Sequence, residues 1–142
     1  MEISEVKRRI LQTIEGAKRV AAERRGRTDE ASRQYETFLE RVAVPMFRQV
    51  ANVLRAENHA FTVFTPATSV RLMSDRSGDD YIELALDATL GEPLVMGHTS
   101  RARGRRVVES ERVVGSGRPA EISEDDVLTF LATELEPFVE KG

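Results

Sequence analysis

Two different spacings of apolar residues divide the chain. Up to residue 54 they recur every three or four positions, which is the period of one face of an α-helix. From Phe61 to Val114 they alternate with polar residues, as in half-buried β-strands. The helical spacing returns after Gly115. The pattern therefore predicts helices on both sides of a run of strands.

Two helices are predicted before the strands. The first covers about residues 4–25, and the glycine at position 26 is expected to end it. Thr28 is expected to cap the second helix, and Pro45 predicts a kink or break near residues 43–44 because proline has no amide hydrogen to donate. One face of the first helix is apolar: Val6, Ile10, Leu11, Ile14, Ala17 and Ala21.

Five strands are expected, joined in an antiparallel meander with a tight turn at Arg103-Gly104. They cover about residues 61–65, 70–73, 81–87, 94–99 and 105–114. Ser123, followed by Asp126 three residues later, predicts a capping box that opens a last helix. The order α-α-β-β-β-β-β-α predicts a two-layer α+β fold with the helices packed on one face of the sheet.

Length, charge and composition favour one domain that self-associates. A chain of 142 residues is the usual size of one domain, so residues 1–142 are expected to fold as one unit, with residues 1–27 peripheral or packed on a second subunit. Residues 1–58 carry 12 Lys+Arg against 9 Asp+Glu, whereas residues 119–142 carry 1 against 7. These opposite ends could pair between subunits, so we expect a homo-oligomer, most simply a dimer, with a protein partner as a further prediction. The start of the chain has no apolar run of signal-peptide or membrane-span length, which predicts a cytoplasmic protein with no membrane partner.

The inventory of chemical groups is small. There is no cysteine, which excludes disulfides, thiolate metal sites and cysteine nucleophiles. His59 and His98 lack the spacing that would put both on one metal ion, and no glycine-rich phosphate loop or nucleophile elbow is present. We therefore expect no catalytic residues, no metal site and no cofactor, and the balance favours a protein that is not an enzyme.

The strongest local signal is a run of arginines at the predicted hairpin. Arg101, Arg103, Arg105 and Arg106 crowd one turn, where they repel one another unless counter-charges or an anion lie near. Glu109 and Glu111 on the outgoing strand are the expected counter-charges for a solvated turn. The alternative is an anion or nucleic-acid site, because arginine forks match phosphate oxygens. The acidic net charge of −3 and an aromatic content of 6% count against nucleic acid.

A second candidate site lies in the middle of the meander. Arg71, Tyr81 and His98 are polar side chains rising from three successive strands, and they are the expected lining of a small-ligand pocket. The leading hypothesis from the sequence is a non-enzymatic interaction or structural module that forms a homo-oligomer. Nucleic-acid binding through the arginine hairpin, and a ligand-binding domain or unrecognised enzyme, are the alternatives.

Overall fold

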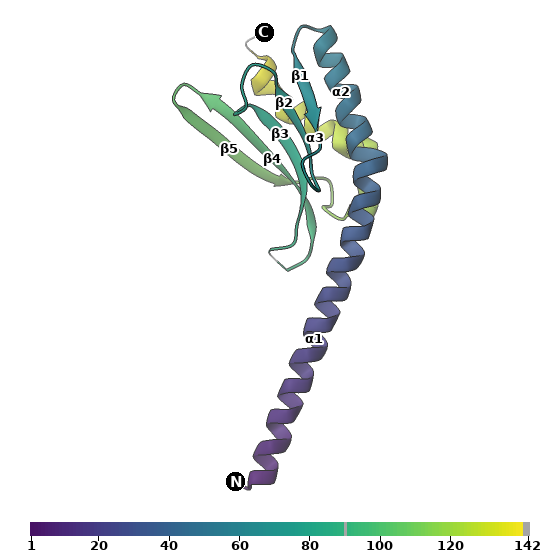
Figure 1. The fold of residues 1–142 in the computed structure, drawn as a ribbon, viewed down its shortest axis with the longest axis vertical. Helices are drawn as coiled ribbons and strands as arrows, with labels where there is room; N and C mark the ends of the chain where they lie inside the picture. Colours follow the sequence, from purple (N-terminus) through teal and green to yellow (C-terminus); the bar gives the residue numbers. More distant parts are fainter. Residues whose placement is uncertain (90, 141–142) are drawn as a thin grey trace.

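The computed structural model of the chain describes residues 1–89 and 91–140 and has the predicted fold class (Figure 1). Helices pack with a five-stranded antiparallel sheet, in the expected order along the chain. The elements are α1 (Ile3–Phe38), the π-helical segment η1 (Leu39–Ala43), α2 (Val44–Ala56), β1 (Phe61–Phe64), β2 (Val70–Ser74), β3 (Tyr81–Asp87), β4 (Leu94–Arg103), β5 (Arg106–Val113), the short 3-10 helix η2 (Pro119–Glu121) and α3 (Glu124–Val139).

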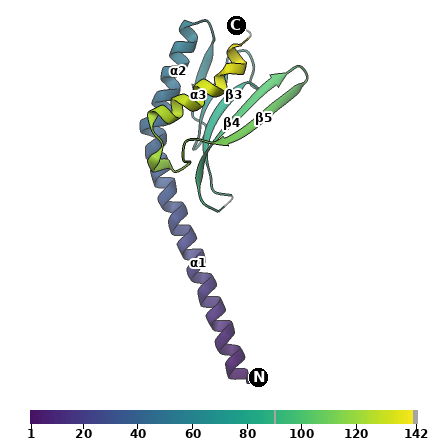
Figure 2. The same cartoon turned by 180° about the vertical axis from the view of Figure 1, so that it is seen from behind.

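The sheet is a simple meander in which each strand pairs with the next. Alternation along the strands places one apolar set on the face covered by α2 and α3, as the sequence predicts. Figure 2 shows α3 lying across this face. The core residues on this side, all buried, are Phe47 of α2, Leu72, Ile82, Leu84 and Val95 of the sheet, and Val127 and Leu131 of α3. The other face of the sheet carries no helix of the described chain.

One glycine lets α3 lie close to the sheet. A Cβ added at Gly97 in β4 would lie 2.2 Å from a ring carbon of Phe130, so any side chain there would collide with α3. The ring of Phe130 thus takes the place of a side chain on β4. At the start of α3 the predicted capping box is present, with Ser123 and Asp126 each accepting a hydrogen bond from the other's backbone amide.

The prediction that Gly26 ends the first helix is wrong. α1 runs without interruption from Ile3 to Phe38, and Gly26 is not among the residues with positive φ. An interior glycine costs a helix only about 1 kcal/mol, and the residues on either side of it are good helix formers. The first predicted helix and the start of the second are therefore one helix, α1, about 54 Å long at 1.5 Å per residue. Thr28, expected to cap a second helix, lies in the interior of α1.

The irregularity expected at Pro45 is a π-helical segment and not a break. Proline cannot donate a hydrogen bond to the carbonyl four residues before it, so the regular α-helical ladder must be interrupted near this position. The chain adjusts over Leu39–Ala43, where the Val44 amide donates to the carbonyl of Leu39, five residues back. α2 then continues along the sheet, with Pro45 in its first turn.

α1 has two parts with different surroundings. Residues 3–27, which we call the stalk, extend away from the sheet and its packed helices, which we call the body (Figure 1). All but two of the stalk residues are exposed, and the exceptions, Glu5 and Gly16, are only partly covered. From Tyr35 onward the helix enters the core. None of the helices that the structure describes is long and apolar enough to cross a bilayer.

Candidate functional site

The stalk exposes an apolar stripe along one side. Six large apolar side chains in it are between 43% and 87% exposed: Ile3, Val6, Ile10, Leu11, Ile14 and Val20. Ala17 and Ala21 fill the gaps of the same stripe. Scattered apolar residues are ordinary on a protein surface, whereas exposed apolar side chains gathered along one side of a helix are less common.

The same stripe continues into the core of the body. After Arg24 and Thr28, the same spacing reaches Ala31, Tyr35 and Phe38, and the last two are buried. The Tyr35 hydroxyl donates a 2.6 Å hydrogen bond to the carbonyl of Thr68, which anchors α1 to the turn before β2. Burial raises the pKa of the Tyr35 phenol well above its usual value. The stalk is therefore the free end of a helix whose other end is firmly fixed.

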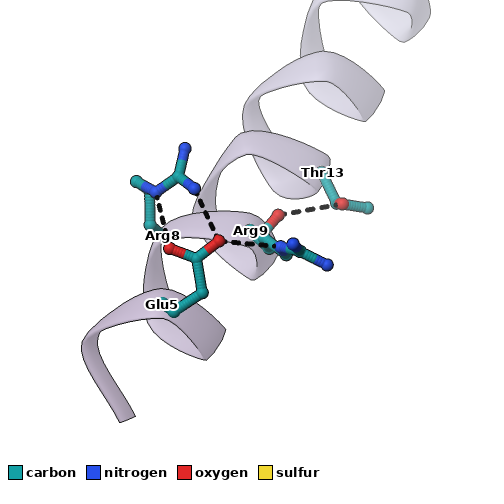
Figure 3. Close-up of polar contacts among 4 residues, drawn as sticks. All are labelled: Glu5, Arg8, Arg9 and Thr13. Atoms are coloured by element: carbon teal, nitrogen blue, oxygen red, sulfur yellow. Dashed lines mark hydrogen bonds and ion pairs between the residues drawn. The ribbon is translucent and has the colours of Figure 1, made fainter. Parts of the chain in front are cut away.

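The opposite side of the stalk is polar and suited to water. Near the start of the helix, Glu5 forms ion pairs with Arg8 at 2.6 Å and with Arg9 at 2.9 Å, as Figure 3 shows. Thr13, in the same row of the helix as Val6 and Val20, donates from its hydroxyl to the Arg9 carbonyl at 3.1 Å. Exposed pairs at this spacing contribute about 0.3–0.5 kcal/mol each to a helix. They support the helical conformation of the stalk but do not cover its apolar side.

The arginine hairpin lies at the tip of β4 and β5, as predicted. Arg103 pairs with Arg106 across the ladder, and Gly104 has a positive φ of 65°, as a tight turn requires. Arg103, Arg105 and Arg106 are exposed, and Arg101 is partly covered. Among the described residues, none of the four guanidinium groups forms an ion pair with a carboxylate.

The counter-charges expected for this hairpin lie on the other face of the sheet. Glu109 and Glu111 pair across the ladder with Ser100 and His98, so they share a face with these residues. Arg101 and Arg106 alternate with them along the strands and point the opposite way. Each glutamate is instead 3.4 Å from a ring nitrogen of His98. The alternation of side chains along β5 explains why carboxylates so near in sequence do not neutralise the turn.

Arg71, Tyr81 and His98, the residues predicted to line a pocket, lie side by side on the sheet face without helices. The Arg71 guanidinium carbon is 4.1 Å from the centre of the Tyr81 ring, a cation–π contact, and Arg71 also pairs with Glu83 at 2.6 Å. The Tyr81 and His98 rings follow with centroids 5.8 Å apart. All three side chains are only partly covered. They form a stack across β2, β3 and β4, and its polar ends are already paired with carboxylates.

Two of the hollows elsewhere on the molecule exceed 500 Å³. One, of about 640 Å³, separates α1 from η2 and the end of the β3–β4 connection. Arg118, one of several charged residues that line it, pairs with Glu92 at 3.5 Å and Glu121 at 3.8 Å. The other, of about 530 Å³, contains His59 and is lined mainly by polar residues at the end of α2. Neither hollow includes Arg71, Tyr81, His98 or the hairpin arginines. Within the part of the chain that the structure describes, no cluster of three metal-ligating side chains occurs.

One buried carboxylate was not singled out from the sequence. Glu134 of α3 is only 7% exposed; it accepts a 3.1 Å hydrogen bond from the Thr99 hydroxyl and pairs with Arg112 at 2.7 Å. The interaction ties α3 to β4 and β5. In the sequence Glu134 stands between apolar positions of an amphipathic helix, and this departure from the apolar pattern is the only sign of its burial.

Comparison with protein-family models, with curated proteins and with solved structures found no match to this chain. A function for the chain therefore has to be inferred from the geometry of the stalk, the hairpin and the stack.

Proposed function

We propose that the protein is a non-enzymatic module that assembles as a homodimer through the apolar stripe of the stalk. The observation that carries this proposal is the exposure of Ile3, Val6, Ile10, Leu11, Ile14 and Val20 on a helix whose first 25 residues extend beyond the body. Burying such side chains is the main driving force of protein association.

The stripe has the properties of a helix-pairing surface. From Ile3 to Phe38 the seam positions are separated alternately by four and three residues, which is the repeat by which two helices keep one seam in contact, and all of them are apolar except Lys7, Arg24 and Thr28. At the body end of α1 this seam packs on the chain's own core. Along the stalk the chain offers no described element to cover it, and a second stalk has the length and the apolar width to do so.

Light scattering coupled to size-exclusion chromatography tests the proposal. At micromolar concentration we expect a mass of twice the chain's 15.9 kDa, with little change between low and moderate salt because the contact is apolar. A mass of one chain at every accessible concentration would contradict the proposal.

The arginine hairpin supports a second candidate function, the binding of nucleic acid. Four arginines without a described carboxylate partner give a local positive charge at an exposed tip, and a two-stranded ribbon can enter a groove. Fluorescence anisotropy with a labelled duplex tests it: binding should weaken steeply as salt is raised and should be lost when Arg103, Arg105 and Arg106 become serine.

A matched control separates this site from general basicity. Changing Arg19, Arg24 and Arg25 of the stalk to serine removes the same net charge far from the hairpin. Equal loss of binding in both triple variants, or no binding at low salt, would rule out a hairpin site.

A further inference from the structure

The order of residues along the stripe indicates how two stalks would pair, and this inference rests on the proposed function of the stalk as a dimer contact. We propose that they pair antiparallel, about a twofold axis near Gln12, so that the two bodies lie at opposite ends of one long helical pair. The partner is a second copy of this chain.

The seam positions of the stripe are symmetric about residue 12. Two antiparallel helices of identical sequence bring residues together whose numbers add to a constant, and for the seam positions of this stalk that constant is 24. Ile3 then lies opposite the partner's Ala21, and Ile10 opposite the partner's Ile14. Each large residue near the ends meets a small one, and the two isoleucines meet at the centre. Layers of this kind fill the space between two helices evenly.

The same register also covers the apolar residues beside the seam. Antiparallel helices bring equivalent flanking positions together, so that Val6 lies next to the partner's Val20, and Leu11 lies next to the partner's Leu11 across the axis. Val6, Leu11 and Val20 lie beside the seam, so the apolar stripe is wider than the row of seam positions. In this arrangement every large apolar residue of the stalk has an apolar neighbour on the other chain.

Charge disfavours a parallel, in-register pair. That arrangement would place two copies of Lys7 in one layer and two copies of Arg24 in another, and like charges so placed repel. In the antiparallel register Lys7 lies opposite the partner's Ala17, and Arg24 lies beyond the partner's first residue. The stalk carries eight Lys+Arg against three Asp+Glu, so any arrangement that spreads these charges is favoured.

The consequence is a spacer. Residue 28, where the stalk meets the body, lies 16 residues from the axis in each chain, so the two bodies begin about 48 Å apart at 1.5 Å per residue. Each body would present its arginine hairpin and its Arg71–Tyr81–His98 stack at opposite ends of the assembly. The dimer would therefore be bivalent, with its two sets of surfaces held at a fixed distance.

Chemical cross-linking tests the arrangement directly, because the chain has no cysteine of its own. Three single variants, Ile3→Cys, Leu11→Cys and Ala21→Cys, are treated separately with a short bismaleimide. The antiparallel pair predicts that only Leu11→Cys links to itself, since two copies of residue 3 or of residue 21 would lie about 27 Å apart along the helices. A mixture of Ile3→Cys and Ala21→Cys is expected to give the mixed product.

The outcomes distinguish this inference from the proposed function. Self-linking of Ile3→Cys and Ala21→Cys in a protein with the mass of a dimer would overturn the antiparallel register but leave the stalk dimer in place. A dimer in which no stalk cysteine links would overturn both, because the contact would lie elsewhere. Gln12→Cys, level with the axis but on the outer side of the helix, is the control for non-specific linking.

Discussion

Replacing Ile10 and Ile14 together with serine should weaken self-association strongly without unfolding the body. Both side chains lie in the middle of the stalk, where they are 55% and 44% exposed in the single chain. Isoleucine and serine have similar helix propensities, so the change removes apolar surface while the stalk stays as helical as before. The stalk also contributes no residue to the described core of the body, so the body should unfold at the same urea concentration as in the unchanged protein.

The size of the effect follows from the surface that pairing would cover. Burying a whole isoleucine side chain contributes about 1.5–3 kcal/mol, so the exposed parts of Ile10 and Ile14 would together contribute about 1.5–3 kcal/mol per chain. A dimer contains both residues twice, which gives about 3–6 kcal/mol. At about 1.4 kcal/mol per tenfold change, the dissociation constant should rise about a hundredfold to ten-thousandfold.

Sedimentation equilibrium over a wide concentration range measures this constant, and far-ultraviolet circular dichroism follows the helix content. The matched control is the double change of Gln12 and Arg19 to serine, on the opposite side of the same helix turns. Replacing Gln12 and Arg19 with serine lowers helix propensity more than replacing the two isoleucines does. Any loss of association in this control is therefore an upper limit on what loss of helix alone causes. Equal dissociation constants for the isoleucine variant and the unchanged protein would refute the reasoning.

Three further predictions concern the body. Gly97→Val should lower the free energy of unfolding by about 1–3 kcal/mol or more, since even a Cβ would lie 2.2 Å from the phenyl ring of α3; an unchanged urea midpoint would count against this packing. Arg112→Ala leaves the buried carboxylate of Glu134 without its cation and should lower the free energy of unfolding by about 1–3 kcal/mol in the same assay. An unchanged free energy of unfolding would indicate that this carboxylate is solvated. In Tyr81→Phe, Tyr35 is the only tyrosine, and burial raises its pKa, so tyrosinate absorbance should stay low above pH 10 while the protein is folded. Stability linked to this phenol is present below pH 10 and is lost as pH rises further, because the unfolded state ionises first; a normal titration in the folded protein would contradict the burial.

Alternation of apolar and polar residues was sufficient to predict the sheet. Ile82, Leu84 and Leu86 take one side of β3 and Glu83 the other, and this single period also determines which face the helices cover. The hairpin at residues 103–106 followed from a glycine between two such strands. Local patterns of this kind are sufficient because each strand has one buried and one solvated side.

The errors and omissions have tertiary or contextual causes. Gly26 resembles a helix stop, but the good helix formers around it continue the helix through that position. The close approach of Phe130 to Gly97, and the burial of Glu134 beside Thr99, depend on how α3 crosses the sheet. No spacing in the sequence encodes that crossing.

The candidate sites were predicted unevenly. The positions of Arg71, Tyr81 and His98 on adjacent strands did indicate that they would lie together, because a meander brings equivalent positions side by side. The pairing of His98 with Glu109 and Glu111 depends on strand register, which the sequence pattern left open. The stripe of the stalk was visible in the sequence, but only the structure shows that the body leaves it uncovered.

Distances between spin labels in the dimer test the central claim most directly. Cysteines at Gln12 and Arg19, in separate variants, place labels on the same outer side of the stalk two turns apart, away from the apolar stripe. In an antiparallel pair centred on residue 12, labels at position 12 lie at one level on the two outer sides of the pair, whereas labels at position 19 are offset by about 21 Å along the axis. The antiparallel account predicts a clearly longer distance for position 19 than for position 12. Equal distances at the two positions would show a parallel pair, and no measurable dipolar coupling at either would contradict a dimer formed through the stalk.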